Sequence, residues 1–197
     1  MRILRFGAVL VLAFAWSAVA RAQSSSFGVG ASGGIVDAAE REFKFSDFER
    51  SDVNVWAQYA VDRQVFLRAT LGRMHVAAYN AGQLVVNDGV TATVPDDVRD
   101  RIDYGLIATS YDFVESAWTS GLFAGVGIYR VKPGIPPGDL AFAADKEETV
   151  FGFHFGVDAQ LTIWRTLGIL GRVTCHIPQT NPHRVLITAD AGVSYRF

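Results

Sequence analysis

The sequence has little cysteine, little net charge and few long apolar runs. Among its 197 residues there is a single cysteine, Cys175, so no disulfide can form within one chain. The formal net charge is −2 and no basic cluster stands out, so charge gives no reason to expect a nucleic-acid partner. After residue 22 no apolar run is long enough for a transmembrane helix, although 50% of all residues are hydrophobic. The apolar residues are therefore dispersed, and their spacing is informative.

The first 22 residues have the pattern of a secretory signal peptide. Arg2 and Arg5 form a basic start, residues 7–19 form an apolar run, and Ala20-Arg21-Ala22 is a cleavage site of the A-x-A type. We therefore predict a signal peptide at 1–22 and a single mature domain at 23–197.

The stretch from Arg184 to Phe197 shows the spacing most clearly. From Val185 onward its odd positions are all apolar, whereas its even positions are mostly polar or small. Successive side chains of a strand point to opposite faces, so this stretch predicts a strand with one apolar and one polar face. The strand closes on two aromatic residues, Tyr195 and Phe197.

The same alternation recurs in seven further segments. We predict strands at about 25–35, 53–61, 64–76, 102–112, 118–130, 151–163 and 166–177, in addition to 184–197. The segment 102–112 is the weakest. Its apolar parity is assigned to Ile102, Tyr104, Leu106 and Ala108, which leaves Ile107 as the only large aliphatic side chain on the polar face.

The side chains on the polar face of the predicted strands, which we call the polar parity, decide between a soluble and a membrane barrel. This parity carries Arg, Asp, Gln, His, Thr and many Gly, whereas the apolar parity is continuous. A soluble eight-stranded barrel has the opposite arrangement, so we predict that the apolar face contacts lipid. An open sheet edge would leave backbone groups unpaired in hydrocarbon, so the strands must close. The prediction is an all-β, eight-stranded antiparallel up-and-down transmembrane β-barrel.

Connection lengths predict the orientation of this barrel. The connections near residues 62, 115 and 164 are short, and they alternate with longer ones. Bacterial barrels have tight periplasmic turns and longer outer loops, which places both termini in the periplasm. The predicted outer loops are 36–51, 77–101 and 132–148. Within the second, two β-rich runs flank Asp88-Gly89, which predicts a projecting hairpin.

Aromatic residues on the apolar parity fall near the ends of the predicted strands. This is the arrangement of the two aromatic girdles at membrane interfaces. The predicted interfacial aromatics are Tyr104 and Phe151 toward the long loops, and Tyr59, Trp118, Tyr195 and Phe197 toward the short turns.

Charged residues on the polar parity are predicted to meet inside the barrel. The short turn after residue 163 and the loop after residue 177 would set Arg172 opposite both Asp158 and Asp190. An Arg between carboxylates is compensated by charge-assisted hydrogen bonds, whereas each charge alone would be costly to bury. We interpret Arg68, Asp158, Arg172 and Asp190 as a lumen ion-pair network. A conducting or gating role and a catalytic carboxylate pair are the alternatives.

No residue pattern predicts a cofactor or a metal site. His75, His154, His176 and His183 lack the i, i+4 spacing of a metal pair and have no carboxylate box beside them. There is no Gly-rich phosphate loop and no G-x-S-x-G motif.

With its signal peptide, alternating strands, long outer loops and closing run Gly192-Val193-Ser194-Tyr195-Arg196-Phe197, the chain resembles the OmpA/OmpX-type outer-membrane β-barrel family. The resemblance covers nearly all of residues 23–197 and rests on pattern, and only the C-terminal strand is motif-like. It implies an integral protein of the Gram-negative outer membrane that contacts lipid. The implied role is structural or adhesin-like, with an extracellular ligand at the outer loops as one reading and ligand-free loops as the other. A narrow, porin-like diffusion pore is the alternative, and the oligomeric state is not predicted.

The enzymatic alternative is the outer-membrane lipid A deacylase, also an eight-stranded barrel. Its catalytic His is followed two residues later by a Ser nucleophile. His176 and Asp190 could occupy the His and acid positions, but Pro178 stands where the Ser would be. Acyl transfer of this kind needs a nucleophile, so we expect no enzymatic activity.

Overall fold

The computed structural model describes residues 27–38, 50–79, 82, 84–87, 90–94, 98–113, 118–134, 147–164, 166–180 and 184–197. The predicted signal peptide at 1–22 lies outside these residues, as do most of the predicted outer loops 36–51 and 132–148.

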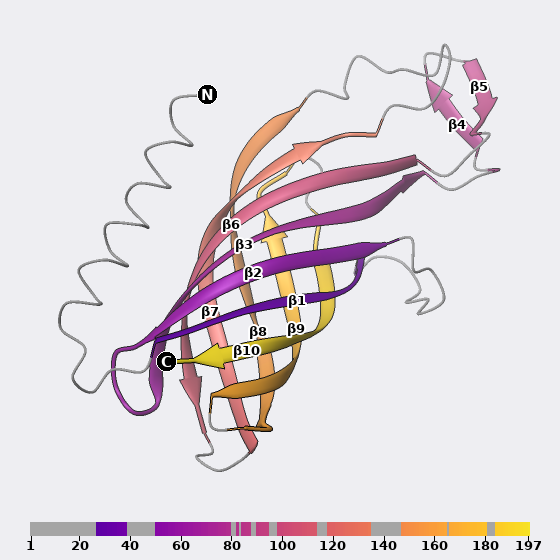
Figure 1. Cartoon of the computed structure of the whole chain (residues 1–197). Coiled ribbons are helices and arrows are strands. Elements are labelled where there is room, and N and C mark those ends of the chain that lie inside the picture. Colours follow the sequence, from indigo (N-terminus) through magenta and orange to yellow (C-terminus); the bar gives the residue numbers. More distant parts are fainter. Residues whose placement is uncertain are drawn as a thin grey trace.

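Eight of the strands close into one antiparallel barrel in the order β1-β10-β9-β8-β7-β6-β3-β2 (Figure 1). Each barrel strand is paired on both sides, and closure is made by β1 with β10. The predicted fold class is therefore confirmed. The barrel strands are β1 (Phe27–Ala38), β2 (Ser51–Ala60), β3 (Val65–Tyr79), β6 (Val98–Asp112), β7 (Trp118–Lys132), β8 (Glu148–Thr162), β9 (Leu167–Pro178) and β10 (Leu186–Arg196).

The predicted hairpin in the second long loop is also confirmed. β4 (Leu84–Asn87) pairs with β5 (Val90–Thr93) in a separate two-stranded sheet. Its Asp88-Gly89 turn lies outside the described residues. Figure 1 shows this hairpin beyond one end of the barrel, which we call the loop end, whereas the C-terminus lies toward the other end, which we call the turn end.

Alternation works as predicted in seven of the eight segments. The predicted apolar parity points outward, and its larger side chains are exposed along the barrel wall, for example Leu71, Ile128 and Phe153. The opposite parity is buried in the lumen, as at Trp56, Arg68 and Arg172. Side chains from all sides fill the space inside, as expected for a barrel of this size.

The assignment for β6 was wrong, because its two faces are reversed. Tyr104 is 5% exposed and Leu106 is 6% exposed, whereas Ile107 is 55% exposed. Tyr104 is therefore a lumen residue and not an interfacial aromatic. It fits inside because Gly72 stands opposite it on β3, where any Cβ would lie 2.3 Å from the Tyr104 ring.

The physical reason is that an apolar cluster occupies part of the lumen toward the loop end. Its buried side chains come from five strands. Many inward-facing residues are thus apolar at this height. The assumption that the polar face of a strand is the lumen face fails there. The cluster consists of Val36, Met74, Val76, Ile102, Tyr104, Leu106, Tyr129, Val131 and Leu186.

Candidate functional site: the filled lumen

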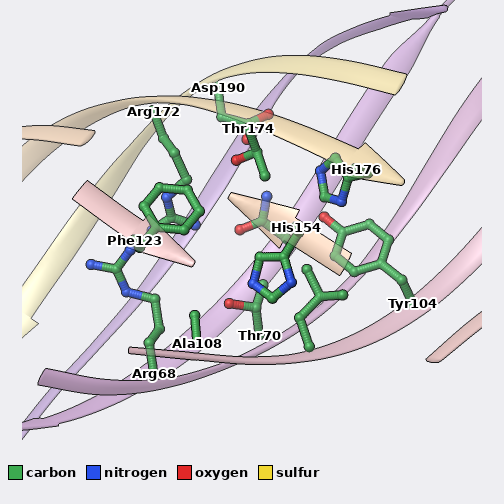
Figure 2. A pocket seen from close by; sticks show the side chains of 12 residues that line it. Arg68, Thr70, Tyr104, Ala108, Phe123, His154, Arg172, Thr174, His176 and Asp190 are labelled. Atoms are coloured by element: carbon green, nitrogen blue, oxygen red, sulfur yellow. The ribbon is translucent and has the colours of Figure 1, made fainter. Parts of the chain in front are cut away.

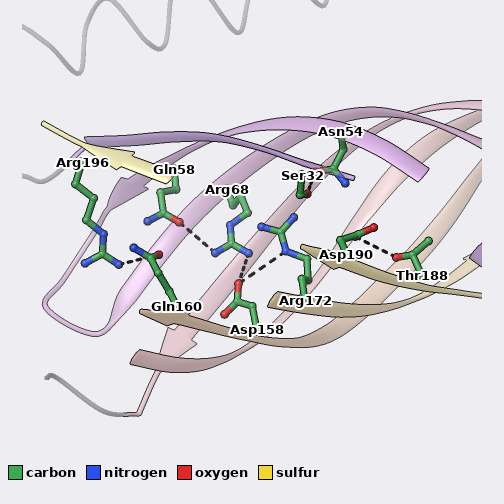
Figure 3. Close-up of polar contacts among 10 residues, drawn as sticks. All are labelled: Ser32, Asn54, Gln58, Arg68, Asp158, Gln160, Arg172, Thr188, Asp190 and Arg196. Carbon is green, nitrogen blue, oxygen red and sulfur yellow. Dashed lines mark hydrogen bonds and ion pairs between the residues drawn. The ribbon is translucent and has the colours of Figure 1, made fainter. Parts of the chain in front are cut away.

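An ion pair crosses the middle of the lumen. Arg68 on β3 donates from Nη1 to Asp158 Oδ2 on β8 at 2.6 Å, and from Nη2 to Gln58 Oε1 on β2 at 3.1 Å (Figure 3). Arg68 is 7% exposed, so its charge is almost completely removed from water. A buried charge of this kind requires a close partner, and Asp158 supplies it.

A second arginine lies beside this pair. Arg172 Nε on β9 is 3.9 Å from Asp158 Oδ2, so one carboxylate serves both guanidinium groups. Both groups also lie against aromatic rings. The guanidinium carbon of Arg68 lies 5.2 Å from the centroid of the Trp56 ring and 5.6 Å from that of the Phe123 ring. The corresponding distances for Arg172 are 5.6 Å and 5.7 Å. Cation–π contact compensates part of the lost hydration of the two cations.

The predicted registers of the network are present, but its contacts are distributed differently. Arg172 is the Cα partner of both Asp158 and Asp190, as the sequence predicted. Within the described residues, Asp158 forms ion pairs shorter than 4.0 Å with both Arg68 and Arg172. No ion pair of that length connects Arg172 to Asp190 in the same residues. Instead, Asp190 accepts a weak hydrogen bond from Thr188 Oγ1 at 3.5 Å. The strongest contact is therefore the cross-lumen one made by Arg68.

A polar network that the sequence did not predict lies toward the loop end. Asp52 on β2 is 1% exposed and accepts hydrogen bonds from Tyr104 Oη at 2.8 Å and from Asn54 Nδ2 at 2.7 Å. Asn54 Oδ1 accepts in turn from Ser32 Oγ at 2.8 Å. Asp52 has the inward parity of β2 but stands just before the predicted segment 53–61. Extending that segment by one residue would have identified Asp52 as a lumen residue.

Two histidines stack on one another in the same region. The His154 and His176 rings lie 6.3 Å apart with an interplanar angle of 22°. His176 Nδ1 is 3.1 Å from Tyr129 Oη, and His176 Nε2 is 3.4 Å from Thr188 Oγ1. Both histidines are nearly fully buried. Both pack as buried aromatic residues, and His176 also makes hydrogen bonds.

The space left between these groups is very small. A cavity of about 20 Å³ is lined by Arg68, Tyr104, Phe123, His154, Arg172 and Asp190 among others (Figure 2). This volume has room for about one water molecule. Among the described residues, Arg172 Nη2, His154 Nδ1 and Asp190 Oδ1 have no hydrogen-bond partner and are the groups such a water would bridge. The lumen therefore holds side chains rather than a substrate-sized pocket.

The remaining predicted aromatics point away from the lumen. Trp118, Phe151 and Tyr195 are 50%, 50% and 43% exposed on the outer wall. Phe197 is 72% exposed, and its ring lies 5.0 Å from that of Tyr195. Tyr59 is partly buried at the turn end of β2, where its Cα partner on β1 is Phe27. They lie near the ends of their strands, which are the positions the sequence analysis assigned to them.

Within the residues that the structure describes, no group of three or more His, Cys, Asp or Glu side chains could hold a metal ion. The same residues contain no helix that is long and apolar enough to cross a membrane.

No family model matches the sequence, and no curated protein matches it. Solved structures do match the fold. A major outer membrane protein from Thermus thermophilus aligns with a TM-score of 0.59 and 14% identity, covering 89% of this chain and 100% of that one. Neisserial surface protein A aligns with a TM-score of 0.58 and 13% identity, covering 88% and 97%. The N-terminal β-barrel domain of Pseudomonas aeruginosa OprF aligns with a TM-score of 0.55 and 10% identity, covering 87% and 97%. The chain thus has the fold of the OmpA/OmpX-type outer-membrane β-barrels.

Proposed function

We propose that this protein is an integral outer-membrane β-barrel without enzymatic activity, whose role is structural or lies in surface interaction through its outer loops. The observation that carries the proposal is the apolar band on the outer wall. Its large side chains are 42% to 64% exposed and are contributed by every barrel strand except β1. Apolar patches of that extent are rare on soluble monomers, and they need lipid or another protein to cover them.

The height of the band fits the outer membrane. On β7 the outward positions from Trp118 to Ile128 are mostly apolar. They cover about ten residue steps, or about 33 Å along the strand. With a strand tilt of about 40°, this corresponds to roughly 25 Å, the height of the apolar band in outer-membrane barrels.

Polarity reverses above the band, which supports a membrane boundary at that height. Ile128 points outward and is 57% exposed, whereas the next outward residue of β7 is Arg130. At the same height the lumen contains the hydrophobic cluster with Tyr129 and Val131. At this height the inward residues of β7 are thus apolar and its outward residue is charged, which is the reverse of the pattern expected for a wall in lipid. An upper part of the barrel in water and a lower part in lipid would account for both patterns.

The filled lumen supports a structural role over a porin-like one. Trp56, Phe123 and the two arginines occupy its centre, and the cavity beside them has a volume of only about 20 Å³. For the enzymatic alternative, His176 and Asp190 are both buried inside the barrel, away from the outer wall where a lipid substrate would lie. Pro178 supplies no nucleophile at the position where the lipid A deacylase has its Ser.

Ligand contact through the outer loops 36–51, 77–101 and 132–148 is the interaction role we propose. Loops placed on a rigid scaffold commonly carry binding, because the scaffold itself must fill and close. The β4-β5 hairpin, which lies beyond the loop end in Figure 1, is the described part of these loops best placed to meet a partner.

Two measurements test the proposal together. Detergent-extracted membranes, run unboiled and boiled on a gel, should show a boiling-dependent mobility shift. Trypsin applied to whole cells should cut in the outer loops, at Arg41 or Lys44, and leave Arg63 in the β2-β3 turn intact. Arg63 should become accessible only after the cells are permeabilised. A soluble periplasmic protein without a mobility shift would refute the proposal.

A further inference from the structure

Cationic side chains form two rows on the outer wall at the loop end. In the first row, Arg73 on β3 is the Cα partner of Asp103 on β6, which is the partner of Arg130 on β7. In the second row, two residues closer to the loops, Arg101 is the partner of Lys132. We call Arg73, Arg101, Arg130 and Lys132 the basic belt. These residues share the outward parity of the exposed residues Leu71, Ile107 and Ile128.

Among the residues that the structure describes, two carboxylates pair with the four cations of the belt. Asp103 lies 2.5 Å from Arg73 Nε and 3.5 Å from Arg101 Nη2. Glu147 pairs with Arg130 Nε and lies 3.5 Å from Lys132 Nζ. Each carboxylate is therefore shared by two cations, which leaves an excess of positive charge. Arg73 and Arg130 use Nε in these pairs, and their side chains are 53% and 44% exposed.

The belt is confined to one side of the barrel. Within the described residues of β8, β9, β10, β1 and β2, no Lys or Arg occupies the outward parity. At the same height β8 presents Thr149 and then Phe151. The belt also begins directly where the apolar band ends, because Arg73 follows Leu71 and Arg130 follows Ile128 on the same face. A single strip of the wall therefore combines an apolar surface with a cationic edge.

We propose that the basic belt binds the phosphate groups of a phosphorylated glycolipid in the outer leaflet, while the apolar band below it contacts the acyl chains of the same molecule. This inference rests on the proposed membrane location. The guanidinium fork matches the geometry of a phosphate, and bidentate pairs of this kind are among the strongest hydrogen bonds in proteins. We infer an amphipathic ligand because the belt borders the apolar band. A soluble anion would contact the belt alone and would leave the apolar wall uncovered.

The test uses the mature chain folded in dodecyl maltoside micelles and titrated with lipid A carrying two phosphates. Lipid bound per barrel is counted by native mass spectrometry. The double variant Arg73→Gln with Arg130→Gln should bind at least tenfold more weakly than the unaltered protein. Arg63→Gln in the β2-β3 turn is the matched control and should bind normally. Asp103→Asn removes a competing carboxylate and should bind at least as tightly as the unaltered protein.

Two further arms identify the ligand. Dephosphorylated lipid A should bind at least tenfold more weakly, and inorganic phosphate at 10 mM should displace little of the bound lipid A. Equal binding of the phosphorylated and dephosphorylated lipids would overturn the inference, and so would unchanged affinity of the double variant. Full displacement by inorganic phosphate would identify a free anion as the ligand and overturn the assignment to a lipid. The mobility shift on unboiled gels is recorded for every variant. Loss of the shift in the unaltered protein would refute the membrane proposal, whereas a normal shift without lipid preference would refute the belt alone.

Discussion

Arg68 and Asp158 join opposite walls of the barrel through a single contact of 2.6 Å between Nη1 and Oδ2. Their strands are not neighbours, because β7 and β6 stand between β8 and β3 in the sheet. The backbone hydrogen bonds of the sheet connect only adjacent strands. A cross-lumen ion pair is therefore a brace of a different kind, and it opposes flattening of the barrel.

Arg68→Ala should destabilise the folded barrel by about 3 kcal/mol, because it leaves the Asp158 carboxylate buried with only the more distant Arg172. The measurement is equilibrium unfolding by urea in detergent micelles, followed by tryptophan fluorescence. Combining Arg68→Ala with Asp158→Ala should recover part of the loss, since no uncompensated carboxylate then remains at residue 158. A loss in the double variant equal to the sum of the losses in Arg68→Ala alone and Asp158→Ala alone would show that the two side chains do not interact.

Tyr104→Phe tests the reversed face of β6. The hydroxyl of Tyr104 donates to the buried carboxylate of Asp52 at 2.8 Å, so its removal should cost about 1–3 kcal/mol of unfolding free energy. Tyr111→Phe is the matched control on the same strand. Its hydroxyl donates to Gln64 Oε1 at 2.8 Å in an exposed setting, and its loss should change stability by less than about 0.5 kcal/mol. If Tyr104 lay at the membrane interface, the two substitutions would have similar effects.

Gly156→Ala should be destabilising by about 1–3 kcal/mol, because the added methyl group overpacks the lumen. A Cβ at residue 156 would lie 2.1 Å from the Val173 carbonyl oxygen and 2.6 Å from Phe123 Cζ. Gly171→Ala on the outer wall is the control, since its nearest neighbour is a carbonyl oxygen at 4.0 Å. Urea unfolding of the two variants side by side provides the comparison. Equal stability would mean that Phe123 can move and that the lumen is less tightly packed than its geometry indicates.

The barrel could be predicted because the alternation of apolar and polar residues can be recognised within each strand alone. Apolar surroundings on one face and a packed lumen on the other both favour this alternation. The registers of Arg172 with Asp158 and Asp190 followed from the lengths of the connections alone. In β6 the same reasoning failed. Ile102, Tyr104 and Leu106 are as apolar as Ile107, and only the tertiary packing of the loop-end cluster decides which set points inward. The polar residues Ser110 and Asp112 share the parity of Tyr104, and they were the local signal of the correct face.

Contacts across the lumen could not be predicted in the same way. The pairing of Arg68 with Asp158 depends on the diameter of the closed barrel and on where the Trp56 and Phe123 rings leave room. Neither quantity is encoded in the spacing of residues along one strand. The network of Asp52 with Tyr104 was missed for a related reason, because reversing β6 removed its donor from the lumen.

Glu147 should titrate below an ordinary glutamate. The hydrogen bond from Arg130, followed by the positive charges of Arg130 and Lys132, lowers the pKa of its carboxyl below the usual 4.5. A depressed pKa means that the contact stabilises the fold at pH values above 4.5 and that this contribution is lost as the pH falls through the lower folded-state pKa. Carbon-13 NMR of the side-chain carboxyl measures the titration directly. Arg130→Gln should raise the midpoint toward 4.5, and an unchanged midpoint would show that the pair does not persist in solution.

The unaltered barrel should not conduct ions in a planar lipid bilayer, because guanidinium groups and aromatic rings occupy the centre of its lumen. Arg68 and Arg172 both lie within 5.7 Å of the centroids of the Trp56 and Phe123 rings, so removing the rings removes what the cations pack against. The double variant Trp56→Ala with Phe123→Ala should therefore pass measurable single-channel current. Trp118→Ala removes an aromatic ring from the outer wall and should remain silent. Current through the unaltered protein would mean that the packed arrangement opens in the bilayer, and the porin-like alternative would then replace the structural role.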